Sequence, residues 1–142
     1  MALLAFGHAD RDAATDDREF GKLKVVKLSS AARLPERASA DTAGYDLYAS
    51  ADVTIKAKSR KPVPTGIAAL APPGTFIRLA PRYGLAIQYI DVLGGVLDPD
   101  FRDEIKVVLI NHGSRDFQVT HGARVAQLTL ERIITNSSVV QV

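Results

Sequence analysis

Cysteine is absent from this chain of 142 residues, which excludes disulfides, thiolate zinc sites and thiol nucleophiles together. A large charge of either sign is also missing, because 18 basic residues face 16 acidic ones and leave a formal net charge of +2. This balance does not indicate a nucleic-acid-binding surface, so nucleic acid is not expected as a partner. The histidines, His8, His112 and His121, lack the spacing of metal ligands and are expected at the surface.

Long apolar runs are missing as well. No window approaches the ~18 consecutive apolar residues of a membrane-spanning helix, so no membrane association is expected. The apolar start, residues 1–6, is too short for a signal peptide and is followed by aspartates instead of a small-residue cleavage site. We therefore expect an intracellular protein, either cytoplasmic or nuclear.

The length fits one domain, and 46% hydrophobic with 24% charged residues is an ordinary globular balance. Residues 1–21 mix Ala, Asp and Arg without a strand or helix period, and they are predicted to form a flexible arm. A short helix over residues 10–20 is the alternative. The folded β domain is expected over residues 22–134, followed by a C-terminal tail over residues 135–142.

Short strands dominate the pattern after the arm. Val53, Ile55 and Ala57 alternate with polar residues, which is the period of a half-buried strand. Turn residues recur every ~8–12 positions, as in a sandwich or barrel. The chain is therefore predicted to be all-β, with one helical turn at residues 81–86. The expected strands cover residues 23–28, 45–49, 53–57, 63–70 (bent or at an edge), 75–80, 87–93, 105–111, 117–120 and 124–133.

Two acidic groups could carry chemistry. Asp46 lies between Tyr45 and Leu47, so in a strand it would point to the opposite face from both; a plain solvated strand residue is the alternative. In an extended segment, Asp98, Asp100 and Arg102 would share one face; repulsion between the two carboxylates would raise the pKa of one and suit a general base, and Arg102 would counter that effect. A hairpin whose Asp-Pro-Asp tip caps its own backbone amides is the alternative.

A third candidate group follows Pro81. A glycine close to an arginine in a tight turn, here Gly84 and Arg82, can offer backbone N–H groups and a guanidinium to phosphate oxygens. The pattern is weak by itself, and no Gly-rich phosphate loop with a Gly-Lys-Ser ending occurs in the chain.

Taken together and in order, several segments resemble the motifs of the trimeric deoxyuridine triphosphatase (dUTPase) family. The first four family motifs resemble AGYDLY (43–48), PRYGLA (81–86), GVLDPDFRDE (95–104) and GARVAQL (122–128), and KVVLINH (106–112) is also similar to the family. The similarity extends over about residues 23–133.

The resemblance implies a distorted jelly-roll β-fold and a homotrimer with active sites between subunits. It implies hydrolysis of dUTP to dUMP and pyrophosphate, by water attack on the α-phosphorus with Mg²⁺ on the triphosphate. The apolar residues of the strand at 124–133 are expected to be available for a partner subunit.

The resemblance also implies roles for individual residues. Asp98 would hold the 3′-hydroxyl and activate the water, and Asp46 would reach a Mg²⁺-bound water. Phe101 would pack under the deoxyribose and exclude a 2′-hydroxyl. The phosphates would be held by Arg82, the Gly84 backbone and Gln127, with Tyr83 at the same site. The uracil edge would be read by backbone groups of Gly95, Val96, Leu97 and Asp98.

Three departures from the family pattern concern the phosphate side. Tyr83 replaces the usual serine of the second motif, and its ring would fill phosphate space unless it turns away. Asp103 replaces a glycine, which puts a carboxylate near the triphosphate. The fifth motif, a Gly-rich arm with an Arg and a Phe, is not found before Val142, the last residue of the sequence. These departures lead us to expect weakened hydrolysis.

The departures also leave a second hypothesis open. A catalytically inactive dUTPase-fold protein could act through partners, because the tail Val140-Gln141-Val142 has apolar residues at the last and third-last positions. Such a tail can add a strand to the groove of a PDZ domain. An ordinary frayed terminus matches the same loose pattern.

Overall fold

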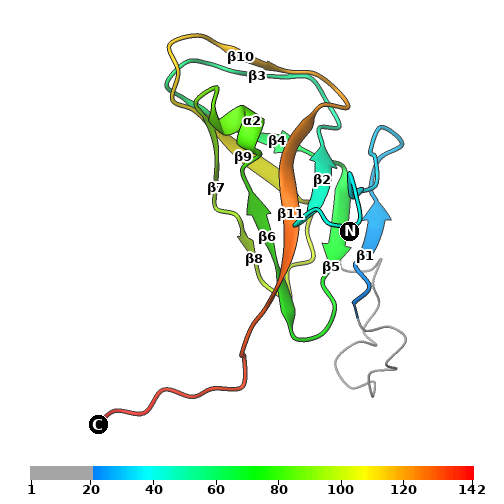
Figure 1. The fold of residues 1–142 in the computed structure, drawn as a ribbon, viewed down its shortest axis with the longest axis vertical. Helices are drawn as coiled ribbons and strands as arrows, with labels where there is room; N and C mark the ends of the chain where they lie inside the picture. Colours follow the sequence, from blue (N-terminus) through cyan, green and yellow to red (C-terminus); the bar gives the residue numbers. More distant parts are fainter. Residues whose placement is uncertain (1–20) are drawn as a thin grey trace.

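The structure is a computed structural model that describes residues 21–142, so the predicted arm lies almost wholly outside the described residues. Figure 1 shows a body made of strands, with the pair β3 and β10 at one end and the C-terminal residues leaving from the other. The elements are β1 (Lys24–Lys27), β2 (Tyr45–Tyr48), β3 (Val53–Ile55), β4 (Arg60–Pro64), β5 (Ile67–Leu70), β6 (Thr75–Ala80), α2 (Tyr83–Ala86), β7 (Ile90–Leu93), β8 (Val96–Leu97), β9 (Lys106–Asn111), β10 (Phe117–Val119) and β11 (Arg124–Arg132).

The strands pair into small antiparallel sheets. The largest has the order β2-β11-β6-β8, the next has the order β4-β9-β7, and β1 pairs with β5 as β10 does with β3. Neighbours in these sheets are far apart in sequence, as expected for a jelly-roll type of fold. The all-β prediction is therefore confirmed. No helix in the described part of the chain is long and apolar enough to cross a membrane.

The core follows from the alternation within the strands. Along β9, Val107, Leu109 and Asn111 are buried, and the residues between them are more exposed. Asn111 is polar, but its side-chain amide donates hydrogen bonds to the carbonyl oxygens of Ile55 and Arg115 at 3.1 and 2.7 Å. This buried amide thus joins β9 to the end of β3 and to the turn before β10, which keeps its desolvation cost low.

Three strand predictions need correction. Residues 63–70 form two strands, because the chain turns at Thr65 and Gly66, and β4 is an edge strand of its sheet. The strand expected over residues 87–93 begins only at Ile90, because Ile87 is the C-terminal cap of α2. The two-residue strand β8 was not predicted, since two residues are too few to show a period.

The apolar residues of β11 are mostly used within the chain. Val125, Ala126 and Leu128 belong to the core cluster of the same subunit, and Leu130 packs against it. The expectation that this strand offers apolar residues to a partner is therefore wrong for most of its length. Along the segment from α2 to β8, large apolar side chains are exposed instead at Tyr83, Ile87, Tyr89, Leu93 and Val96.

Candidate functional site

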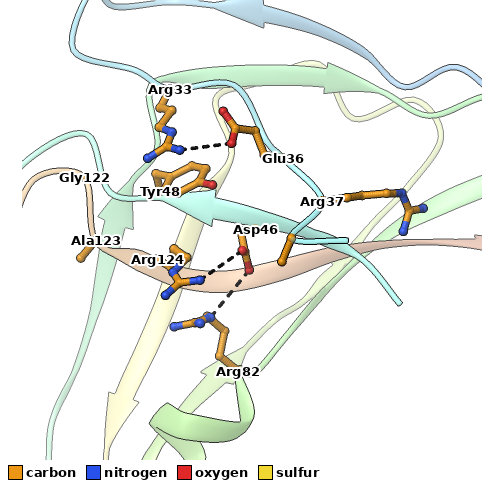
Figure 2. A pocket seen from close by; sticks show the side chains of 10 residues that line it. Arg33, Glu36, Arg37, Asp46, Tyr48, Arg82, Gly122, Ala123 and Arg124 are labelled. Atoms are coloured by element: carbon orange, nitrogen blue, oxygen red, sulfur yellow. Dashed lines mark hydrogen bonds and ion pairs between the residues drawn. The ribbon is translucent and has the colours of Figure 1, made fainter. Parts of the chain in front are cut away.

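Asp46 is the centre of a charged cluster on β2. Its side chain is 17% exposed, and its two carboxylate oxygens lie 3.8 Å from Arg82 Nε and 3.7 Å from Arg124 Nη1. Figure 2 shows the two guanidinium groups converging on the carboxylate. The alternative of a solvated strand residue is therefore wrong. Both distances exceed those of direct hydrogen bonds, so the carboxylate oxygens keep capacity to accept from a ligand or a water.

A β-bulge brings Arg124 to this cluster. In the pairing of β2 with β11, Arg124 lies opposite Tyr48 while Ala126 lies opposite Leu47, so Val125 is the extra residue. In a regular strand Arg124 and Gln127 would point to opposite faces, because they are three positions apart. The bulge removes this difference, and Gln127 lies directly opposite Asp46.

Gln127 also holds the segment that carries Arg82. Its side-chain amide donates a hydrogen bond of 3.1 Å to the carbonyl oxygen of Pro81. Arg82 has extended backbone angles (φ −82°, ψ 136°) and is the N-terminal cap of α2. Its carbonyl oxygen accepts hydrogen bonds from the N–H groups of Leu85 and Ala86 at 3.1 and 2.9 Å. Gly84, in the first turn of α2, has open space around the position of a side chain.

A cavity of about 660 Å³ surrounds Asp46. Four arginines and two carboxylates contribute to its wall, a surplus of two positive formal charges. Such a surplus in a concave site attracts multivalent anions. The lining residues are Arg33, Glu36, Arg37, Ala38, Asp46, Tyr48, Arg82, Gly122, Ala123 and Arg124.

The aromatic substitution in the second motif does not fill this cavity. Tyr83 is 82% exposed and is not one of the lining residues. Within one chain its ring therefore does not fill the cavity around Asp46, and whether it obstructs phosphate binding in an assembly stays a prediction.

Asp98 and Phe101 lie in another part of the chain. Residues 95–97 run antiparallel to β6, so Gly95 is beside Leu79, and Asp98 follows at the level of Phe76. Arg82 is six positions further along the chain than Phe76, and at ~3.3 Å per strand residue this separates the two groups by about 20 Å. The predicted residues therefore form two groups, one around Asp46 and one around Asp98.

The segment after Leu97 is a turn. The N–H of Phe101 donates a hydrogen bond of 2.9 Å to the carbonyl oxygen of Asp98, and Arg102 Nη1 donates to the carbonyl oxygens of Pro99 and Phe101. The extended arrangement with Asp98, Asp100 and Arg102 on one face is therefore wrong; the segment turns, as in the alternative, but the hydrogen bond that closes the turn is accepted by the backbone carbonyl of Asp98 and not by a side chain. Phe101 packs partly buried against the core, and Asp98 stays exposed.

Asp103, the second departure from the family pattern, has ordinary backbone geometry. Among the described non-glycine residues, only Lys58 and Tyr89 have positive φ angles. The backbone at position 103 therefore does not need a glycine. Its side chain is exposed, and it is not part of the cavity wall around Asp46.

Four residues that line the cavity were not predicted as site residues: Arg33, Glu36, Tyr48 and Arg124. Tyr48 lies in the first family motif and Arg124 in the fourth, so their place in these motifs could have indicated that they line the site. Arg33 and Glu36 lie outside the motifs, and no pattern in the sequence indicates that their loop folds over β2. No group of three or more metal-ligating side chains occurs among residues 21–142.

Comparisons with known proteins agree with this picture. The family model described as dUTPase matches residues 30–142. Deoxyuridine 5′-triphosphate nucleotidohydrolase of Saccharomyces cerevisiae is 46% identical over 130 residues, which are 91% of this chain and 86% of the relative. The enzyme of the same name from Yarrowia lipolytica is 49% identical over 114 residues, 80% of this chain and 73% of the relative.

Solved structures give the same fold at lower identity. The dUTPase of the Staphylococcus aureus phage phi11, in a study of how a structural Mg(II) ion is coordinated, superposes with a TM-score of 0.79 at 22% identity. The match covers 85% of this chain and 96% of that one. The matches to the family model and to the curated relatives, over most of the chain, show that this protein belongs to the dUTPase family.

Proposed function

We propose that this protein hydrolyses dUTP to dUMP and pyrophosphate, by attack of a water molecule on the α-phosphorus. The observation that carries the proposal is the arginine-lined cavity around Asp46, built from the first, second and fourth motifs of a chain that belongs to the dUTPase family. The curated relatives named above are nucleotidohydrolases of deoxyuridine 5′-triphosphate, with which this chain shares nearly half of the aligned residues.

The phosphate chain of dUTP is assigned to this cavity. Arg82 contributes a guanidinium whose geometry matches two phosphate oxygens, and the open backbone at Gly84 lets a phosphate approach closely. Gln127 is assigned to the same phosphates, and its hydrogen bond to Pro81 keeps the arginine segment in place. Positioning and charge neutralisation by such donors are what phosphoryl transfer requires of a protein.

The residues around Asp46 fit a Mg²⁺ ion that is bound mainly by the substrate. Mg²⁺ usually keeps several waters and takes one or two carboxylates together with substrate phosphates. Asp46 is a single, partly exposed carboxylate without close hydrogen bonds from its arginine neighbours, and it would hold a metal-bound water. When bound, the metal would neutralise charge on the triphosphate.

The uracil and sugar are assigned to the other group of residues. β8 is the last strand of its sheet, so in the described structure one row of backbone groups at Val96 and Leu97 faces outward and can read a base edge. The carbonyl oxygen of Gly95 already accepts a hydrogen bond from the N–H of Leu79 at 2.6 Å. Other backbone groups must therefore bind the base edge. Phe101 would lie against the deoxyribose, and Asp98 would hold the 3′-hydroxyl and orient the attacking water.

A homotrimer brings these two groups together. In one chain, Asp98 and Arg82 are separated by about 20 Å along the direction of β6. At this distance Asp98 cannot orient a water molecule at the α-phosphorus of a nucleotide whose phosphates are bound by Arg82 of the same chain. Copies of the chain arranged around an axis would place the Asp98 region of one subunit next to the Asp46 cavity of another. The exposed apolar side chains of Tyr83, Ile87, Tyr89, Leu93 and Val96 are available for such contacts.

We expect light scattering to give the mass of three chains at micromolar protein concentration. Contacts between subunits that cover some of these exposed apolar side chains would stabilise the assembly in water. A single-chain mass at this concentration would contradict the composite site, because no subunit by itself joins Asp98 to the phosphate cavity.

Tyr83→Ser tests whether the ring contributes to contacts between subunits or obstructs the cavity. Because the ring is exposed and does not line the cavity around Asp46, we expect an unchanged KM for dUTP and weaker assembly, seen as dissociation at higher protein concentration by sedimentation. Tighter nucleotide binding with unchanged assembly would instead show that the ring occupies phosphate space in the assembled protein.

Asp46→Asn tests the metal assignment. The variant keeps the size of the side chain but loses the negative charge that would hold a metal-bound water. We expect the Mg²⁺ concentration for half-maximal hydrolysis to rise by about tenfold or more, with a smaller change at saturating metal. Chelation of Mg²⁺ should stop turnover of the unmodified protein. An unchanged metal requirement in the variant would remove Asp46 from the metal site.

Pyrophosphate release from dUTP, dTTP, dCTP and UTP, each with Mg²⁺, tests the function itself. We expect turnover of dUTP far above that of the other three nucleotides. Equal turnover of all four would indicate a nucleotidase without base or sugar selection, and no turnover of dUTP would contradict the proposal.

Weakened activity and the interaction hypothesis receive no support from the features described. Tyr83 lies outside the cavity, and the exposed carboxylate of Asp103 does not line it. The PDZ-type tail rests only on the loose pattern of Val140 and Val142, which are exposed in the structure, and we do not adopt it. An intracellular location, cytoplasmic or nuclear, stays a prediction.

A further inference from the structure

Arg33 lies at the rim of the Asp46 cavity, on the loop between β1 and β2 and outside every family motif discussed above. Its guanidinium carbon is 4.0 Å from the centre of the Tyr48 ring, and its Nη2 donates a hydrogen bond of 3.1 Å to Glu36 Oε2. Figure 2 shows Arg33 and Glu36 on one side of Asp46 and the pair Arg82 and Arg124 on the other.

The backbone that carries Arg33 is held from both sides. Ala32 is buried, and the carbonyl oxygen of Ala31 lies 2.8 Å from His121 Nε2, next to the turn that precedes Arg124. After Arg33, Glu36 pairs with Asp46 through two backbone hydrogen bonds of 2.7 and 3.4 Å. The loop therefore presents the Arg33 side chain at a defined place on the cavity wall, which lowers the entropy lost when a ligand binds.

The charges around Arg33 leave it available to an anion. The pKa of Arg33 is raised, chiefly by the hydrogen bond to Glu36, so the group is a permanent cation. Burial raises the pKa of the Tyr48 phenol, so the ring beneath Arg33 stays neutral. The side chains of Arg33 and Glu36 are 53% and 57% exposed, and an exposed ion pair of this kind contributes little and exchanges readily.

The other arginines of the cavity wall have interaction partners different from those of Arg33. Arg82 and Arg124 both face Asp46. Arg37 donates a hydrogen bond to the carbonyl oxygen of Thr42 and stacks on the Tyr45 ring at 4.4 Å, and Figure 2 shows its guanidinium pointing away from the cluster. Among the three wall arginines that face a carboxylate, Arg33 is therefore the one whose partner, Glu36, is itself largely exposed and separate from Asp46, so a phosphate can replace that partner without disturbing Asp46.

We propose that Arg33 is a substrate-binding residue: it binds the phosphates farthest from the sugar, and Glu36 competes with them for the same guanidinium. The inference rests on the proposed function, which places the phosphate chain in this cavity. A guanidinium presents paired N–H donors to phosphate oxygens, and a phosphate group with more than one negative charge competes well against a single carboxylate. Glu36 thus holds Arg33 in place while the site is empty and lowers its affinity for weaker anions.

The test uses the full chain and four variants: Arg33→Gln, Arg33→Lys, Glu36→Gln and the control Arg60→Gln. Arg60 is exposed on the edge strand β4 and outside the cavity wall, so its variant removes the same charge elsewhere. Calorimetry with Mg²⁺ would measure the binding of inorganic tripolyphosphate, of dUMP, and of a dUTP analogue with an imido group between the α- and β-phosphorus. Thermal unfolding of each variant would be measured in the same buffer.

We expect Arg33→Gln to weaken binding of tripolyphosphate and of the dUTP analogue by about tenfold, since one charged hydrogen-bond contact is lost. Binding of dUMP should be unchanged, and Arg33→Lys should restore part of the loss. Glu36→Gln should strengthen triphosphate binding by about threefold, because it removes a competing exposed ion pair. Arg60→Gln should alter none of these affinities.

The proposal is overturned if Arg33→Gln leaves triphosphate binding unchanged, or weakens the binding of dUMP equally. It is also overturned if Glu36→Gln weakens triphosphate binding, because the carboxylate then supports the site instead of competing. Failure of the proposed function has a different signature: tripolyphosphate would still follow the expected pattern across the variants, but the unmodified protein would not release pyrophosphate from dUTP.

Discussion

Asp98→Asn should lower the turnover of dUTP by about 10²–10⁴-fold, the usual contribution of a positioned general base. Asparagine keeps the size of the side chain and can still accept a hydrogen bond from the 3′-hydroxyl, but it cannot take a proton from water. We therefore expect kcat to fall with little change in KM. Because Asp98 is exposed on a turn, the melting temperature should not change.

Asp100→Asn is the matched control for this experiment. Asp100 is an exposed carboxylate in the same turn, two positions from Asp98. Its replacement by asparagine removes the same charge from the same region. We expect its turnover to stay close to that of the unmodified protein. Equal losses in the two variants would show that the charge of the loop matters and that Asp98 has no individual role.

Gly95→Ala should cost about 3 kcal/mol of unfolding free energy, near the upper end for overpacked sites. A methyl group at this position would lie 2.2 Å from the carbonyl oxygen of Leu79, and that oxygen belongs to the backbone of β6. Either β8 or β6 must shift to relieve the overlap, and the hydrogen bond from Leu79 N–H to Gly95 would be strained. Chemical denaturation should therefore show a lower midpoint.

The same substitution should reduce activity, because β8 leads directly into Asp98. A displacement of β8 from β6 moves the proposed uracil-reading backbone and the catalytic carboxylate together. Gly84→Ala is the control for stability, since nothing lies within 4 Å of an added methyl group there. Alanine in that helical turn should leave stability unchanged or raise it by about 0.5–1 kcal/mol. Equal destabilisation by the two substitutions would contradict the close approach at Gly95.

Much of the fold was predictable because it depends on local patterns. The alternation at Val53 and Ile55 predicted β3, and the strand expected over residues 105–111 corresponds to β9. Two of the errors occurred where an element is too short for a pattern. The four-residue helix α2 ends with its cap at Ile87, so β7 begins at Ile90 and not at residue 87 as predicted. The strand β8 was not predicted because it has only two residues.

Part of the candidate site was also predictable. Asp46, Arg82 and Gln127 were selected from separate motifs, and the structure brings these three together at the junction of β2, β11 and the start of α2. Arg124 was overlooked because its approach to Asp46 depends on the bulge at Val125. A bulge is a property of two paired strands, so neither strand shows it in its own sequence.

The sequence by itself determined the all-β class, the absence of thiol chemistry and the resemblance to the dUTPase family, since each follows from composition, short-range alternation or ordered motifs. Only the tertiary structure decided that Tyr83 is exposed outside the cavity wall, that Arg33 lines the cavity and that Asp98 lies far from Arg82 within one chain. These outcomes depend on the register between strands that are distant in sequence. Register is set by the packing of both partners and by where each chain turns, which no single segment encodes.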